Sequence, residues 1–239
     1  MLAASGPSRR YGKPFYNSLT SFNQGDVDVW VVNADGSGRL TNLTDDNNDI
    51  FQKKINADGS VTVTPATDLG PVFSPDATKI AFPSNRLDPP GCTLGDPGCT
   101  NDFDIWVMNA DGSGTPTNLT SNAVTEVLPE YFPDGKRIAF TRFVGDRDIW
   151  VMNTGGTEQR NLTDNMVDPA TNAPTHELHA TWAPDGTKIA FYSGPGTGSL
   201  GIYTATDIWV MNADGSRQTN VTNNGPDVGD IHPNWGIKK

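Results

Sequence analysis

The sequence Asp-Ile-Trp-Val-Met-Asn at residues 104–109, followed by Ala-Asp-Gly at 110–112, decides the fold of this chain. It is a β-branched and aromatic run bounded by polar residues, which is typical of a strand. The Asp-Gly pair after it supplies the positive φ angles that a tight hairpin requires. Close copies of the run occupy residues 28–33, 148–153 and 207–212. The chain is therefore built from repeats, and the repeats predict its architecture.

Two further motifs keep step with the Trp strand. A short segment reading Asn-Leu-Thr or Asn-Val-Thr follows each copy, starting at Asn42, Asn118, Asn161 and Asn220. A turn centred on Pro-Asp precedes three of the copies and leads into Ile-Ala-Phe strands at 80–82, 138–140 and 189–191. Four antiparallel strands per repeat is the pattern of a β-propeller blade. The sequence thus predicts internal blades at about 68–120, 126–163 and 177–222.

The two ends of the chain read as parts of one more blade. Residues 230–239 match the first strand of a repeat, and residues 15–44 match its second, third and fourth strands. We therefore expect an all-β chain with one propeller domain at 15–239, in which four blades close by pairing of the N- and C-terminal strands. Residues 1–14 are expected to form an arm. The alternative is an arc whose terminal strands pair with neighbouring chains.

The Pro-Asp turns, the Ile-Ala-Phe strands and the Asp-Ile-Trp-Val-Met-Asn strands together resemble the repeat of the TolB-like, WD-like β-propeller family. The resemblance covers nearly the whole chain. It implies a propeller of the kind found in periplasmic scaffold proteins and as an accessory domain of larger enzymes. Members of the family usually carry more blades, so the predicted four is a departure from the family pattern.

Composition restricts the function. The net charge is −11 and the isoelectric point is about 4.5, so binding to nucleic acid or to an anionic membrane surface is disfavoured. No apolar run approaches the roughly 18–20 residues that span a bilayer. Residues 1–10 lack the apolar segment of a signal peptide. We nevertheless expect an extracytoplasmic protein, periplasmic or secreted, exported by a route this chain does not show.

Two insertions break the repeat. Residues 45–67 are expected to hold an extra hairpin, and their acidic start offers Asp45, Asp46 and Asp49 as a calcium loop. The segment 87–102 carries the only two cysteines, Cys92 and Cys99, whose spacing a small disulfide loop can close. A disulfide would favour an oxidising compartment. Two free surface thiols are the alternative.

A set of carboxylates lies at equivalent points of the repeat, three residues before the middle of each first strand. The set consists of Asp68, Glu126, Glu177 and Asp230. If the first strands line a central channel, these groups face one mouth of it, where a hard cation such as Ca²⁺ would relieve their repulsion. An acidic rim in water, or pairing with backbone amides, is the alternative.

Catalytic motifs are missing from the sequence. It contains no Gly-x-Ser-x-Gly elbow, phosphate loop, dinucleotide fingerprint or His-Glu-x-x-His motif. His179 and His232 share one repeat position and could bind a transition metal, or be exposed histidines at strand entrances. We predict a non-catalytic module that binds a protein partner or acts as a scaffold. The alternatives are a self-assembling extracellular subunit, stabilised by calcium or by the arm, and a metal-dependent lyase acting on acidic polysaccharide.

Overall fold

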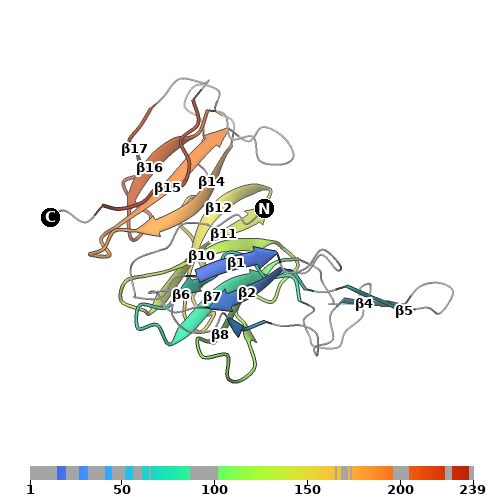
Figure 1. The fold of residues 1–239 in the computed structure, drawn as a ribbon. Coiled ribbons are helices and arrows are strands. Elements are labelled where there is room, and N and C mark those ends of the chain that lie inside the picture. Colours follow the sequence, from blue (N-terminus) through green and yellow to red (C-terminus); the bar gives the residue numbers. More distant parts are fainter. Residues whose placement is uncertain are drawn as a thin grey trace. The chain divides into compact units, whose positions relative to one another are not determined.

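The computed structural model describes residues 15–19, 27–31, 41–44, 52–55, 61–64, 66–86, 102–164, 166–167, 172, 174–195, 205–223 and 228–236. The regular structure in this part of the chain consists of β-strands (Figure 1). None of its elements is a helix long and apolar enough to cross a membrane. The two compact units of the chain are residues 1–127 and 128–239.

Three sheets have four antiparallel strands each, in sequence order. The first contains β6 (Val72–Phe73), β7 (Lys79–Ser84), β8 (Asp104–Asn109) and β9 (Thr117–Asn118). The second contains β10 (Glu126–Tyr131), β11 (Arg137–Val144), β12 (Asp146–Asn153) and β13 (Arg160–Asn161). The third contains β14 (Thr175–Trp182), β15 (Lys188–Pro195), β16 (Asp207–Asn212) and β17 (Thr219–Asn220). These are the four-stranded blades that the repeats predict.

A further sheet has only three strands, β1 (Phe15–Leu19), β2 (Val27–Val31) and β3 (Thr41–Asn42). They correspond to the second, third and fourth strands of a blade. The hairpin expected in the first insertion is present as β4 (Gln52–Ile55) and β5 (Val61–Thr64). The all-β propeller prediction is thereby confirmed. Closure of the ring by the two chain ends, and the predicted domain limits, remain predictions.

One pairing fixes the register of every blade. An aromatic residue of the second strand lies opposite the tryptophan of the third strand in all four sheets. The pairs are Tyr16 with Trp30, Phe82 with Trp106, Phe140 with Trp150 and Phe191 with Trp209. Since a slip of one residue would move the apolar side chains to the opposite face, the pair sets which face of each blade is buried.

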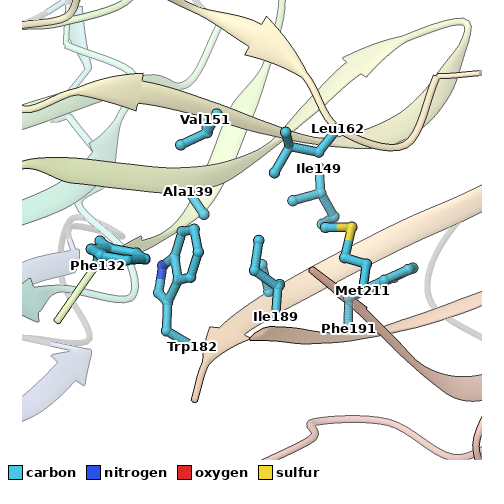
Figure 2. Packing of buried hydrophobic residues seen from close by; sticks show 10 residues of the cluster. Phe132, Ala139, Ile149, Val151, Leu162, Trp182, Ile189, Phe191 and Met211 are labelled. Atoms are coloured by element: carbon cyan, nitrogen blue, oxygen red, sulfur yellow. The ribbon is translucent and has the colours of Figure 1, made fainter. Parts of the chain in front are cut away.

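The core of the second unit lies between neighbouring blades. Ten buried apolar residues make one cluster, half from the sheet β10–β13 and half from β14–β17 (Figure 2). Trp182 is fully buried there, and its ring meets Phe132 edge-on at 4.4 Å between centroids. Its indole N–H donates to the carbonyl of Glu130, 3.3 Å away. We call this contact between the two sheets the seam.

A glycine of the third Pro-Asp turn makes room for the aromatic side of the seam. Gly186 has a φ of +70°, and a Cβ at that position would lie 2.7 Å from Cζ of Phe132. The turn therefore requires glycine for two reasons, backbone conformation and contact with the neighbouring blade. In the first unit a second cluster follows the same plan, with Val29, Phe73, Ile80, Phe82, Trp106 and Met108 buried.

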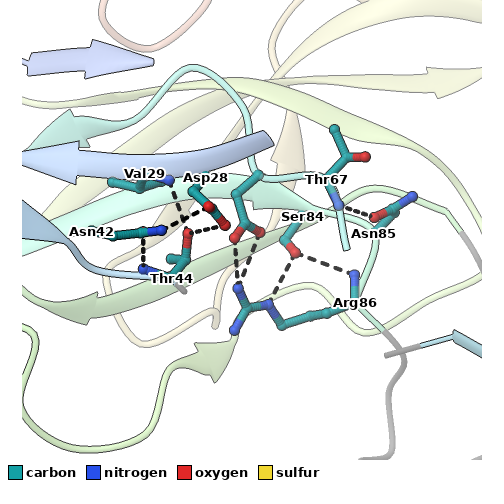
Figure 3. A network of polar contacts seen from close by, with 9 residues as sticks. Asp28, Val29, Asn42, Thr44, Thr67, Ser84, Asn85 and Arg86 are labelled. Atoms are coloured by element: carbon teal, nitrogen blue, oxygen red, sulfur yellow. Dashed lines mark hydrogen bonds and ion pairs between the residues drawn. The ribbon is translucent and has the colours of Figure 1, made fainter. Parts of the chain in front are cut away.

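A polar clasp attaches the short last strand to the strand before it in each of the four blade sheets. In the sheet β10–β13, Asp148 lies on the third strand, β12. Its carboxylate accepts hydrogen bonds from Asn161 Nδ2 (2.9 Å) and Thr163 Oγ1 (3.1 Å). The Thr163 hydroxyl in turn accepts from the N–H of Ile149 at 2.9 Å. Asp28 with Asn42 and Thr44 makes the same contacts (Figure 3).

The clasp recurs at Asp104 and at Asp207, with Asn118 and Thr120 and with Asn220 and Thr222. Because a fourth strand has only two residues in ladder pairing, side-chain bonds contribute much of its attachment. The clasp also explains the four Asn-x-Thr sequences. Their asparagine side chains bind the aspartate, so the motif is a structural requirement of the blade.

Replacing Asp148 by alanine should destabilise the second unit by about 1–3 kcal/mol, because it leaves the buried Thr163 hydroxyl and the half-buried Asn161 amide without their acceptor. The matched variant is Asp207→Ala, whose clasp includes the exposed Thr222 and can be satisfied by water. Urea denaturation followed by tryptophan fluorescence should show the larger loss for Asp148→Ala. Equal losses would mean that burial of the clasp does not determine its contribution.

Candidate functional site

The entry of each first strand has a shared backbone form. The residue two positions after each predicted carboxylate has a positive φ: Gly70 (32°), Leu128 (56°), His179 (58°) and His232 (56°). In β14 this position coincides with a shift in the pairing register between Leu178 and Thr181. An extra residue of this kind bends a strand and re-aims the side chains on either side of it. The repeat therefore places a residue with a positive φ just after each carboxylate, and in β14 a bulge lies there.

Three of the four first-strand segments attach to the preceding blade through the backbone of the carboxylate residue itself. The N–H of Asp68 donates to Val27 O at 2.7 Å, that of Glu126 to Phe103 O at 2.5 Å, and that of Asp230 to Thr206 O at 2.8 Å. Each acceptor directly precedes a clasp aspartate. Residues 228–236 thus dock as the start of a further blade, and Trp235 Nε1 donates to Thr181 O (3.0 Å) as Trp182 does to Glu130.

The four carboxylates have different local partners. Asp68 is fully buried and forms a bidentate ion pair with Arg86, whose Nη2 lies 3.1 and 2.9 Å from the two carboxylate oxygens. The Arg86 side chain is fixed by the Ser84 hydroxyl at 3.0 Å from Nε (Figure 3). A carboxylate neutralised in this way needs no cation. The sequence did not reveal Arg86, because the repeat has no arginine at the matching place.

Glu126 lies beside a second carboxyl group. Its Oε1 accepts from Asn122 Nδ2 at 2.7 Å. Burial raises the pKa of Asp104, while hydrogen bonds from Asn118, Thr120 and the Glu126 side chain act in the opposite direction. A hydrogen bond between two carboxyl groups requires a proton on one of them. The first-strand carboxylate is here paired with the clasp of the preceding blade.

Glu177 has no cation beside it in the described part of the chain. It is 1% exposed, its Oε1 accepts from Ser193 Oγ at 2.7 Å, and its Oε2 has no hydrogen-bond partner. Burial raises the pKa of Glu177 to about 7, assisted by the charges of Asp148 and Asp146. Burial also raises the pKa of Asp148. This carboxyl group therefore carries its proton up to about neutral pH.

Within the described residues, no three His, Cys, Asp or Glu side chains gather as a metal site would require. Asp230, half-buried, is attached through its backbone, with its carbonyl accepting from Thr206 Oγ1 at 3.0 Å. A cation site using all four predicted carboxylates would join the two units and stays a prediction. Asp45, Asp46, Asp49, Cys92 and Cys99 lie outside the described residues, so the calcium loop and the disulfide also stay predictions.

The histidines at the bulge of the second unit meet each other. The rings of His179 and His232 are 4.8 Å apart and nearly perpendicular, with Tyr192 at 6.2 Å from His232. His179 is half-buried, so the expectation of an exposed side chain is wrong for it. Its Nδ1 has no hydrogen-bond partner. Burial lowers the pKa of His179 to about 4, with a smaller contribution from His232.

Comparison with known proteins finds similarity between this chain and TolB proteins. No family model matches the chain. The Tol-Pal system protein TolB of Anaeromyxobacter dehalogenans is 30% identical over 134 residues, which are 56% of this chain and 26% of that protein. A TolB-type structure from Agrobacterium tumefaciens superposes with a TM-score of 0.60 at 21% identity, covering 87% of this chain and 60% of the other. The chain has a β-propeller fold, and its repeats are similar to those of TolB proteins.

The propeller is also similar to part of a protein that is named as a peptidase. The uncharacterized peptidase YuxL of Bacillus subtilis is 28% identical over 144 residues, or 58% of this chain. The chain spans only 19% of that protein and 26% of the TolB protein. The similarity therefore concerns the propeller repeats, and the activities of the longer relatives are not carried by it.

Sequence alignment of the repeats located the carboxylates but not their partners. Arg86 has no counterpart in the other repeats. Serine does recur at the position of Ser193, as Ser18 and Ser84, and asparagine recurs at the position of Asn122, as Asn165 and Asn224, but nothing in the pattern shows that these side chains reach the carboxyl groups. One signal was present. Gly70 occupies the position of Leu128, His179 and His232, and a glycine there suggests a backbone with positive φ.

In the TolB-like propeller, Arg86→Met should destabilise the first unit by about 3 kcal/mol or more, because it leaves the Asp68 charge buried without its partner. The double variant Asp68→Asn/Arg86→Met should recover part of that loss, since both charges are then removed. Chemical denaturation of wild type, both single variants and the double variant gives the coupling. Additive effects would contradict a functional ion pair.

The pKa of His179 offers a direct test of the histidine pair. Its lowered value means that stability is fully present above the unfolded pKa of 6.5 and is lost as pH falls through about 4. Titration of the imidazole Cε1–H signals by NMR should therefore find one histidine still neutral at about pH 5. That signal should be absent in the variant His179→Asn, which assigns it to His179. A titration of His179 near its ordinary value would mean that the pair is open in solution.

Proposed function

We propose that the TolB-like propeller is a non-catalytic, extracytoplasmic module that binds a protein partner or acts as a scaffold. One observation carries the proposal: the polar residues that recur in the blades are used by the blades themselves. The aspartates of the third strands hold the clasps, and those of the Pro-Asp turns accept from the backbone two residues on, as Asp134 does from Lys136 N–H at 2.8 Å. What remains for function is the surface.

The similarity to a Tol-Pal system protein supports a protein partner. The net charge of −11 supports a partner with a basic surface, because an acidic body attracts it over a distance set by ionic strength. The same likeness supports an exported protein, with the periplasm as the proposed compartment. The exposed apolar side chains Val144, Val221, Val228 and Ile231 are available for contact.

The second candidate is the propeller part of a larger peptidase, which the likeness to YuxL favours. A catalytic serine in a nucleophile elbow would then lie outside these residues, because no Gly-x-Ser-x-Gly occurs in the sequence. This candidate and the first share a non-catalytic propeller. They differ in whether the bound protein is another molecule or another domain.

The proposed function predicts saturable binding of the purified chain to the Pal protein of a Tol-Pal system. Isothermal titration at 50 mM and 300 mM NaCl should show affinity that falls by roughly tenfold at the higher salt, as expected for charge complementarity between partners. An unrelated acidic protein of similar size and charge serves as the control for nonspecific attraction.

Two outcomes would overturn the proposal. Turnover of a peptide or of an acidic polysaccharide that disappears in His179→Ala would assign an enzyme. Light scattering that gives a mass several times 25.6 kDa, falling to that value on chelation of calcium, would assign a self-assembling subunit instead.

A further inference from the structure

The seam between the sheets β10–β13 and β14–β17 is apolar along most of its length and ionisable at one end. His176 and Glu177 of β14 lie at that end, at the beginning of the strand. Asp146, Arg147 and Asp148 begin β12 on the other side. All five belong to the second unit. The charges at this end therefore act directly on the contact between two blades.

We propose that this end of the seam is a pH-sensitive joint, closed while the Glu177 carboxyl group is protonated and loosened when it ionises. The argument rests first on geometry. The side chain is 1% exposed and its Oε1 accepts a hydrogen bond from Ser193 Oγ, whereas Oε2 and the nearby Thr175 hydroxyl make no hydrogen bond of good geometry. A neutral carboxylic acid tolerates such a site, whereas a carboxylate there loses its hydration without gaining a cation.

The groups that face Glu177 strengthen this dependence. From β12 come the carboxylates of Asp148 and Asp146, both of which disfavour a further negative charge. From β15 comes the Ser193 hydroxyl, and from β14 itself the Thr175 hydroxyl, and both favour the ionised form. The two hydroxyls do not offset burial. The pKa of Glu177 is accordingly raised from 4.5 to about 7.

His176 makes the same joint sensitive to low pH as well. Its Nδ1 accepts the N–H of Arg147 at 3.1 Å, which links β14 to β12 and requires an unprotonated Nδ1. Burial and the Arg147 charge lower the pKa of His176, while Asp146 and Asp148 act in the opposite direction. Protonation would replace this acceptor by a donor and break the link.

The two groups have opposite signs in the pH dependence. The folded pKa of Glu177 is raised, so its contribution to stability is complete below pH 4.5 and is lost as pH rises through about 7. The folded pKa of His176 is lowered, so its contribution is present above pH 6.5 and is lost as pH falls. A variant that removes only the titration of Glu177 separates the two.

The seam can be followed by hydrogen exchange at pH 6 and pH 8, with rates corrected for the intrinsic effect of pH. In the wild type, protection of the β12 and β14 amides should fall by roughly tenfold at pH 8, relative to β7 and β8. Glu177→Gln keeps the shape without the titration and should abolish this fall. Asp185→Asn, the same change at an exposed turn of the same unit, should leave it intact.

Equal pH dependence in the wild type and in Glu177→Gln would overturn the proposal, as would a carboxyl ¹³C titration of Glu177 near 4.5. If Glu177→Gln does not fold, Ser193→Ala is the second variant. Removing the hydroxyl that favours the carboxylate should move the loss of protection to higher pH, and an unchanged midpoint would count against the joint.

Discussion

The clasp between an aspartate on the third strand and an Asn-x-Thr segment on the fourth is the interaction on which each blade depends. A strand of two paired residues cannot hold itself to a sheet by ladder bonds alone. The clasp adds side-chain hydrogen bonds at 2.7–2.9 Å from asparagine to the aspartate in all four sheets. It also attaches the threonine hydroxyl to the backbone of the third strand. The outer edge of every blade is thereby defined.

The clasp has a consequence at the inner side of the next blade. The residue before each clasp aspartate offers its carbonyl to the N–H of a first-strand carboxylate, at three places in the chain. Acidic side chains of adjacent blades are therefore brought towards one another by the backbone geometry of the repeat. Each blade contact then needs its own way of limiting the repulsion, because the repeat supplies the acids but no common cation.

Much of the fold could be predicted from the sequence, because the repeat expresses local rules. The Asp-Gly turns, the β-branched Trp strands and the four aromatic–tryptophan pairs each follow from residue types at fixed spacing. The functional region could be predicted only in part. Asp68 and Glu177 occupy one repeat position, yet one meets Arg86 and the other meets Ser193. These partners lie on or just after the neighbouring strand of the same blade. Arg86 has no counterpart in the other repeats, and the serine position recurs without showing which carboxyl group it contacts, so the repeat pattern alone does not identify either partner.

The half-buried state of His179 is a second feature that the repeat pattern did not predict. As a residue at a strand entrance it was expected to be exposed, but the bulge turns it towards His232, which belongs to the segment docked after β17. The burial of a strand entrance thus depends on the following blade and not on its own sequence.

Equivalent carboxyl groups in different blades have different partners, so the blades are not equivalent in their chemistry. Both oxygens of Asp68 accept from an arginine guanidinium, whereas Glu177 is buried with no cation beside it in the described part of the chain. The first contact is held by an ion pair, and the second is the contact that we propose responds to pH. A repeat fold can therefore hold one backbone geometry constant and vary the response of each blade contact by a single nearby side chain. In this propeller the place to look for regulated movement is the contact without the arginine.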